Sequence, residues 1–183
     1  DEVVSFNPDE NNLNCKNSGK LTYNYLVVAP GIQLDWHKIK GLKESLGTNG
    51  ICSNYTFESA PYTWETLKNL GRGKAIFTNP NTPIKCGGAP QKIMYLAADY
   101  LRKKGWLKKS EVHFYSGGNI IFGVKKYADV LNKVIERYGI KTHFGHNLVE
   151  VDAKTKTAFF ETKDKENNTI RVAQKFDMLL SLI

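Results

Sequence analysis

The chain has 183 residues, of which 41% are hydrophobic, so it can form one or one and a half compact domains and is not a disordered polypeptide. Its net charge of +8 is spread over scattered lysines, which indicates a solvated basic surface, with an anionic substrate or membrane surface as alternatives and no expected role for nucleic acid. The three cysteines have neither the spacing of a zinc site nor the number of a disulfide-rich secreted domain, which leaves structural or redox-active thiols and no expected metal.

The first forty residues predict β-structure. A short apolar strand over residues 3–6 is followed by the turn Asn7-Pro8-Asp9, and residues 13–15 and 20–23 flank a hairpin turn at Asn17-Ser18-Gly19. Residues 25–29 are all apolar, as is typical of a strand that is buried on both faces, and Pro30-Gly31 ends this run.

The middle of the chain alternates strands and helices. We expect helices over residues 61–70, 90–104 and 124–138, and strands over residues 74–78, 111–115 and 140–144. This order predicts an α/β fold of the dinucleotide-binding, Rossmann-like type, with a parallel sheet and right-handed crossover helices. The spacing of apolar residues predicts that the second and third helices face the core through Ile93, Leu96, Ala97, Tyr100 and Leu101, and through Tyr127, Val130, Leu131, Val134 and Ile135.

The end of the chain repeats the pattern of its beginning. Strands are expected over residues 148–151, 157–162 and 169–173, with a hairpin turn at 163–168, and an apolar strand follows over residues 176–180. A β-meander followed by an apolar run therefore occurs twice, which indicates a duplicated unit. Chance similarity between two meanders is the alternative.

The loop after the first parallel strand, residues 79–91, lies where such folds bind phosphates. It carries no G-x-G-x-x-G pattern, and its prolines remove backbone donors that a phosphate needs. The next strand ends in Tyr115-Ser116-Gly117, without an acidic residue placed for a ribose. We therefore do not expect a bound nucleotide in this part of the chain.

The same loop offers a thiol instead. Cys86 lies just before the helix that Pro90 begins, so the helix dipole and the neighbouring Lys85 favour its thiolate. Gly87 and Gly88 allow another group to approach closely. A redox-active role is the stronger interpretation, and a buried structural cysteine is the alternative. His143 and His146 could form a metal pair, but without a third ligand nearby we expect them at the surface.

Residues 82–96, TPIKCGGAPQKIMYL, closely resemble the cysteine loop of sulfide:quinone oxidoreductases, especially the mitochondrial-like type, within the pyridine nucleotide-disulfide oxidoreductase superfamily. Residues 25–34, 38–42, 53–55 and 121–129 show the same resemblance, which extends over essentially the whole chain. In that family sulfide is oxidised at a pair of cysteines, and the electrons pass through FAD to a membrane quinone.

The resemblance also implies roles for individual residues. Cys86 matches the catalytic cysteine whose thiolate can face the flavin. Val3 matches a backbone position near the adenine side of FAD, and Ala29-Pro30-Gly31 match the turn beside the cofactor. Cys52 lies where three-cysteine members carry a further catalytic thiol, although mitochondrial-type members usually lack it; a shuttle thiol and an inert core residue are both open interpretations.

The resemblance implies a domain organisation as well. Residues 1–42 match the last strands of the first, FAD-binding domain, and residues 43–183 match a second, degenerate NAD-binding-like domain with a β-meander. The family's glycine-rich FAD motif, partner cysteine and amphipathic membrane helices are not found within these residues. We therefore expect a central fragment that is inactive alone, from a protein that is peripheral on the bacterial cytoplasmic or the mitochondrial inner membrane.

Two alternatives remain at this point. An NAD(P)H-dependent disulfide reductase or NADH dehydrogenase would share the duplicated fold, but it would need the phosphate-binding glycines that the loop lacks. A degenerate domain that only binds or scaffolds would carry no flavin at all.

Overall fold

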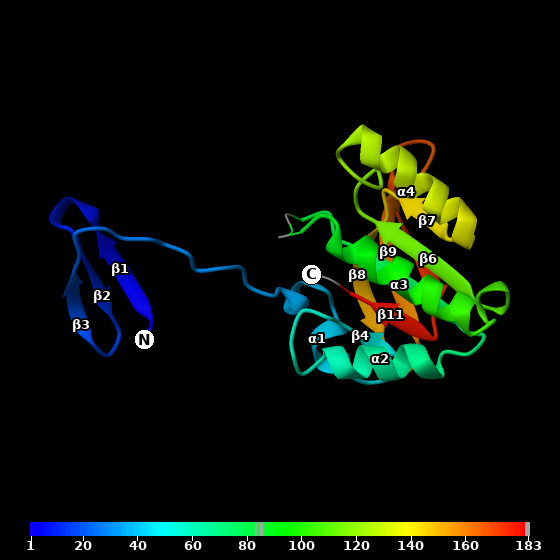
Figure 1. The fold of residues 1–183 in the computed structure, drawn as a ribbon, viewed down its shortest axis with the longest axis horizontal. Coiled ribbons are helices and arrows are strands. Elements are labelled where there is room, and N and C mark those ends of the chain that lie inside the picture. The colour runs from blue at the N-terminus through cyan, green and yellow to red at the C-terminus, as the bar shows by residue number, and fades with distance from the viewer. Residues whose placement is uncertain (83, 85, 182–183) are drawn as a thin grey trace. The chain divides into compact units, whose positions relative to one another are not determined.

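The computed structural model describes residues 1–82, 84 and 86–181. They divide into two compact units, Asp1–Gln33 and Leu34–Ile183 (Figure 1). The sequence predicts a domain boundary between residues 42 and 43, but Ile39 is buried in the core of the second unit and Lys40 forms a parallel bridge with Glu150. The assignment of the two segments to an FAD-binding and a NAD-binding-like domain remains a prediction.

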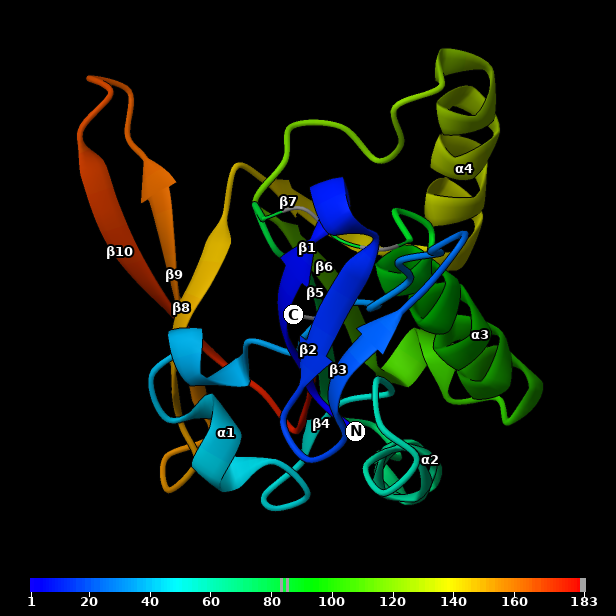
Figure 2. The same ribbon diagram turned by 90° about the vertical axis from the view of Figure 1, so that its left-hand side faces the viewer.

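The first unit is a three-stranded antiparallel meander in the order β1-β2-β3. Its strands are β1 (Val3–Asn7), β2 (Asn12–Cys15) and β3 (Gly19–Thr22), close to the predicted limits (Figure 2). Leu13 and Cys15 on β2 are buried, and Gly19 takes up the left-handed conformation (φ 70°) that the tight turn before β3 requires.

The buried strand predicted over residues 25–29 is wrong for this structure. These residues form no regular secondary structure, and the side chains of Tyr25 and Val27 are 94% and 89% exposed. A strand that is buried on both faces needs hydrogen-bonded neighbours and covering layers, and none of the described residues pairs with this segment.

The second unit is built on a five-stranded sheet in the order β4-β11-β5-β6-β7. All four strand pairs are parallel, which confirms the predicted Rossmann-like α/β fold. β5, β6 and β7 agree with the sequence prediction, whereas β4 and the position of β11 between β4 and β5 were not predicted. The strands are β4 (Ile51–Cys52), β11 (Met178–Leu180), β5 (Lys74–Asn79), β6 (Glu111–Ser116) and β7 (Lys141–Phe144).

Helices cover one face of this sheet. α2 (Ala60–Asn69), α3 (Ala89–Lys103) and α4 (Lys125–Tyr138) lie on the same side of the sheet (Figure 2). Their buried side chains share a core with Ala75 and Phe77 of β5. The predicted limits of the helices are confirmed, but the predicted core face of α3 is shifted by about one residue. Its buried residues are Pro90, Gln91, Met94, Ala97, Ala98 and Leu101.

The predicted core face of α4 is largely wrong. Ile135 is its buried residue, while Tyr127 and Val130 are 58% and 57% exposed. The apolar stripe of α4 is real, but its first half borders an open hollow between α3 and α4 rather than the packed core.

A second meander covers the other face of the sheet. β8 (Asn147–Asp152), β9 (Thr157–Lys163) and β10 (Thr169–Lys175) are antiparallel in the order β10-β9-β8. Together with the short helix α1 (Leu42–Ser45), they enclose a second core that contains Ile76, Leu179 and Phe160. The meander predicted at both ends of the chain is therefore present twice, although only the second copy is followed by a strand, β11.

Candidate active site

The candidate active site is the loop over residues 79–88, which joins β5 to α3 at the carboxyl end of the parallel sheet. Cys86 is exposed there, and its carbonyl oxygen accepts a hydrogen bond from the Ala89 amide at 3.0 Å as α3 begins. A side chain at Gly87 would meet no atom within 4 Å. The thiol is thus open to a reactant and lies beside a helix start, as predicted. Pro83 and Lys85, the lysine expected to favour the thiolate, lie outside the described residues.

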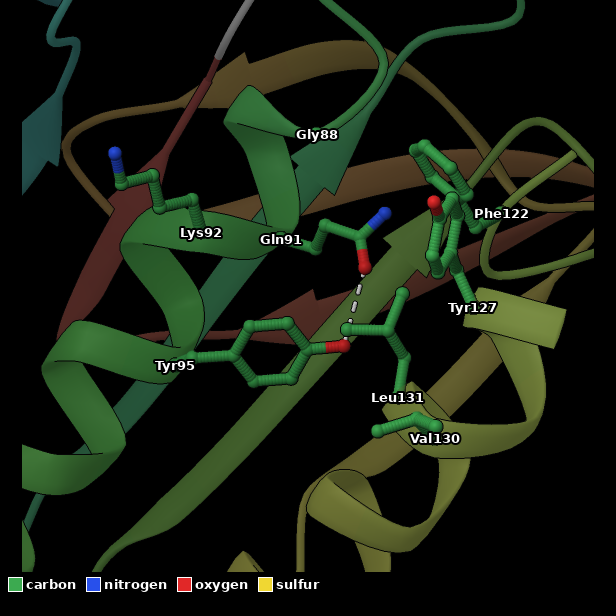
Figure 3. A pocket seen from close by; sticks show the side chains of 8 residues that line it. All are labelled: Gly88, Gln91, Lys92, Tyr95, Phe122, Tyr127, Val130 and Leu131. Carbon is green, nitrogen blue, oxygen red and sulfur yellow. Dashed lines mark hydrogen bonds between the residues drawn. The ribbon is translucent and has the colours of Figure 1, made fainter. Parts of the chain in front are cut away.

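Gln91 connects this loop to the next one. Its buried side-chain amide donates to the carbonyl oxygen of Ile121 at 2.8 Å and, less closely, to that of Gly87 at 3.4 Å. The Gln91 amide oxygen accepts a hydrogen bond from the Tyr95 hydroxyl at 3.1 Å (Figure 3). One side chain thus fixes the loop after β5 relative to the loop after β6. No local pattern predicts this role of Gln91, because the partner carbonyl is thirty residues away.

A hollow of about 420 Å³ lies beside this glutamine, between the first turns of α3 and α4 (Figure 3). Burial raises the pKa of Tyr95 to about 12, so this phenol stays neutral and can donate its hydrogen bond to Gln91. The walls are mainly apolar and include Tyr127 and Val130, the two residues that were expected in the core. The lining consists of Gly88, Gln91, Lys92, Tyr95, Phe122, Tyr127, Val130 and Leu131.

The carboxyl ends of β5 and β6 are packed closely against each other. The Asn79 side chain donates to the Ser116 hydroxyl at 3.1 Å, and the Gly117 amide donates to the Asn79 carbonyl oxygen at 2.9 Å. A Cβ atom added to Gly117 would lie 2.7 Å from the backbone nitrogen of Asn81. Protein backbone therefore occupies the space beside the turn after β6, next to the position where this fold type brings a ligand.

Tyr55 is a further residue near the thiol. Burial raises the pKa of its phenol, and the negative charge that Cys86 carries as a thiolate raises it further. The hydroxyl is buried and has no hydrogen-bond partner among the described residues. Residues 53–55 were noted in the sequence for their family resemblance, but their proximity to Cys86 was not foreseen.

The other two cysteines are buried. Cys52 lies on β4 with 1% of its surface exposed, and its thiol contacts the Gly50 carbonyl oxygen at 3.4 Å. Burial raises the pKa of Cys52 to about 11, which holds it as a neutral thiol at physiological pH. Cys15 is buried on β2 of the first unit.

The residues matched to FAD contacts all lie in the first unit. Val3 begins β1 and is partly exposed, and Ala29, Pro30 and Gly31 are exposed with no regular structure. Gly31 has a φ of 76°, and a side chain there would meet nothing within 4 Å. Their open backbone fits close approach by a flat cofactor, although these residues alone do not enclose one.

The expectation that His143 is a surface residue is wrong. Its ring is half-buried and stacks on Tyr115 at 4.1 Å between centroids, and its Nε2 lies 3.0 Å from Nδ1 of His113. His146 is half-buried as well, with Nδ1 2.8 Å from the Phe144 carbonyl oxygen. Across the residues that the structure describes, no group of three or more His, Cys, Asp or Glu side chains could hold a metal.

Comparison with known proteins identifies the family. The chain is 47% identical over 180 residues to the mitochondrial sulfide:quinone oxidoreductase of Dictyostelium discoideum, with 98% of this chain and 39% of that protein aligned. It is 45% identical over 169 residues to the mitochondrial sulfide:quinone oxidoreductase of Mus musculus, with 92% and 38% aligned. Over the residues that it spans, this chain belongs to the sulfide:quinone oxidoreductase family. It covers well under half the length of these relatives. No protein-family model matches it.

Solved structures agree on the fold. The sulfide:quinone oxidoreductase of the bacterium Aquifex aeolicus superimposes with a TM-score of 0.73 at 20% identity, over 98% of this chain and 41% of that one. NDH2 from Plasmodium falciparum gives a TM-score of 0.66 at 14% identity, over 98% and 39% of the two chains. At such low identities the similarity shows the fold alone and nothing about the reaction.

Within the described part of the chain, none of the helices has both the length and the apolar character needed to cross a bilayer.

Proposed function

We propose that a protein containing this chain is a sulfide:quinone oxidoreductase that oxidises sulfide at Cys86, with FAD as cofactor and a quinone as electron acceptor. The observation that carries the proposal is the exposed Cys86 thiol between β5 and α3, in a chain that is 47% identical to a named member of the family. An accessible thiol next to a helix start can ionise and act as a nucleophile or leaving group.

In the proposed reaction, the sulfur–sulfur bonds and the electrons can be accounted for at each step. Hydrosulfide attacks a disulfide between Cys86 and a partner cysteine, so one S–S bond breaks while another forms. One cysteine then carries a persulfide, and the other is released as a thiolate that holds the electron pair of the broken bond. This attack oxidises the sulfide sulfur by two electrons and reduces the cysteine pair by the same two. A nucleophilic acceptor then takes the sulfane sulfur and leaves the persulfide cysteine as a thiolate. Passing two electrons from the two thiolates to an electron acceptor re-forms the disulfide.

The residues around Cys86 suit this chemistry. Gly87 and Gly88 leave the sulfur accessible, and the amino end of α3 favours a negative charge there. The Tyr55 hydroxyl is buried without a hydrogen-bond partner among the described residues, and a negative charge on Cys86 would raise its pKa further. FAD, when bound, supplies the acceptor for the electron pair and its transfer to quinone, and we place Val3, Ala29, Pro30 and Gly31 beside it.

We propose that Cys52 is a core residue rather than a shuttle thiol. Its burial and its pKa of about 11 both oppose thiolate formation, and the thiolate is the reactive species. Because Cys15 is buried as well, we look for the partner of Cys86 outside residues 1–183. Reduction by NAD(P)H, the alternative from the sequence, has no support in a loop without phosphate-binding glycines.

We further propose a mitochondrial location at the inner membrane. The curated relatives named above are mitochondrial, and a quinone acceptor is an apolar molecule dissolved in the bilayer.

The test uses the whole protein with Cys86→Ser. We expect sulfide-dependent quinone reduction to fall by more than about a hundredfold, because a serine hydroxyl can neither form the disulfide nor leave as a thiolate. The matched control is Cys52→Ser, which removes the other cysteine of the second unit and should keep most of the turnover in folded protein. Normal turnover by the Cys86 variant would refute the proposal. An equal loss of turnover in the Cys52→Ser control would show that Cys52 also takes part in the reaction.

A further inference from the structure

A basic hollow of about 750 Å³ lies at the opposite end of the sheet from Cys86, between the carboxyl ends of α3 and α4. The 3-10 helix Leu107–Lys109 forms part of its wall. Four of its lining residues are cationic, Arg102, Lys108, Lys109 and Arg137, while Glu136 is its one acidic residue.

Three of these four cations have no carboxylate partner among the residues that the structure describes. Arg102 is held by Asp99 at 2.8 Å. By contrast, Lys108, Lys109 and Arg137 have no carboxylate within 4 Å among the residues that the structure describes. Like charges gathered around one concavity repel each other and focus a positive potential into it, so an anion that enters would relieve this repulsion.

The basic residues are not needed to terminate the helices. At the end of α3, the Gly105 and Trp106 amides donate to the carbonyl oxygens of Arg102 and Leu101 at 3.0 and 2.8 Å. At the end of α4, the Ile140 amide donates to the Ile135 carbonyl oxygen at 3.0 Å. Backbone amides thus satisfy several last-turn carbonyl oxygens in both helices, in the manner of a glycine-terminated helix. The lysine and arginine head groups stay available for another ligand.

We propose that this hollow binds a ligand through two or more phosphate groups. Lys108 and Lys109 are adjacent in sequence and exposed, and the guanidinium of Arg137 at the end of α4 lines the same hollow. Arg137 lies over the Tyr138 ring at 5.1 Å, which limits its motion, and guanidinium groups match phosphate oxygens in geometry. A single small anion would leave much of the volume and charge unused.

The experiment measures binding of inorganic tripolyphosphate to the full 183-residue chain by calorimetry. Lys108→Gln with Lys109→Gln should weaken binding about tenfold, because two of the three unpaired cations are lost. The control, Lys163→Gln with Lys165→Gln, makes the same charge change on the exposed β9–β10 hairpin and should leave the affinity unchanged. Glu136→Gln should tighten binding about twofold, since it removes the lining acid.

A second arm uses vesicles of phosphatidylcholine with and without phosphatidylglycerol, in co-sedimentation. Tripolyphosphate binding that depends on Lys108 and Lys109 identifies a soluble phosphate ligand. Binding to anionic vesicles alone, with the same dependence, identifies a lipid head group as the phosphate source. The proposal is overturned if neither probe binds, or if the double variant in the hollow behaves like the control on the hairpin.

Discussion

At the scale of single residues, the structure distinguishes one exposed thiol, that of Cys86, from the two buried thiols of Cys15 and Cys52. Cys86 could be found from the sequence, because Gly87 and Gly88 follow it and Pro90 marks a helix start nearby. The contribution of Gln91 could not be found, since its importance rests on a carbonyl group in another loop. The proximity of Tyr55 depends on how the end of β4 is placed, and a strand of two residues leaves no periodic pattern.

His143 makes the stability of the second unit depend on pH. Burial lowers the pKa of His143 to about 4 and also lowers the pKa of His113 beside it, with Glu111, Lys74 and Lys141 as the charged neighbours. Between pH 6.5, the ordinary histidine value, and about pH 4, the unfolded chain binds protons that the folded chain does not. Stability contributed by the neutral ring is therefore complete above that window and is lost as the pH falls through it.

We expect the contribution of His143 to the free energy of unfolding, measured with urea, to be about 1 kcal/mol smaller at about pH 4.5 than at about pH 7. The difference is kept this small because the ring is only half-buried. His143→Phe keeps an aromatic ring to stack on Tyr115 but cannot titrate, so the variant should lose less stability over the same interval. An equal loss in both proteins would show that the effect comes from another group, such as His113, whose pKa burial also lowers. Glu111 has a pKa of about 2 and loses most of its contribution below pH 4.5.

At the scale of elements, periodicity predicted the strands and helices better than their faces. The limits of α3 and α4 follow from apolar spacing, glycine ends and Pro90, all of which are local. The exposure of Tyr127 and Val130 cannot be predicted in this way. An apolar stripe shows that a helix has an apolar face, but it does not show whether another element covers that face. The sequence prediction missed β4 because a strand of two residues is too short to show a pattern. It wrongly predicted a strand over residues 25–29 because their composition alone favours one.

The insertion of β11 beside β4 depends on Gly50. Its φ is 84°, its carbonyl oxygen accepts the Leu179 amide at 2.8 Å, and a Cβ atom there would collide with the Asp177 carbonyl oxygen. Gly50→Ala should therefore destabilise the unit by more than about 3 kcal/mol, through both backbone strain and collision. Chemical unfolding of the full chain measures the change.

Gly47 provides a matched control for this substitution. Its φ of 77° is nearly the same, but a Cβ atom would meet nothing within 4 Å. Gly47→Ala should cost only the conformational penalty, about 1 kcal/mol. Equal effects at the two positions would mean that close packing against residue 177 does not limit the approach of β11 to β4.

At the scale of the whole molecule, the sequence predicted the fold class and the repeated meander. It could not show where compact units divide, because this depends on contacts such as those of Ile39 with the second core. The segment between the meander of the first unit and the second unit is apolar but exposed, a combination that composition alone does not reveal.

Limited proteolysis can test this organisation. Tyr25 and Phe57 are 94% and 90% exposed and are both chymotrypsin sites, but their backbones differ. Phe57 lies in a turn that is closed by a 2.9 Å hydrogen bond between Thr56 and Ser59, whereas Tyr25 begins a stretch without regular structure. We expect cleavage after Tyr25 to be about tenfold faster, because a protease must open the turn at Phe57 first. Mass spectrometry of early products would contradict this if Phe57 were cut first.

The order of strands in the second sheet also has a consequence during biosynthesis. β4 and β5 precede α3, yet they are joined only through β11, whose residues are made after the second meander. A ribosome must therefore pass residue 180 before the inner edges of β4 and β5 can acquire their hydrogen-bonded neighbour. Until then a nascent chain carries two unpaired strand edges, and this long-range closure is the step that a chaperone would need to shield.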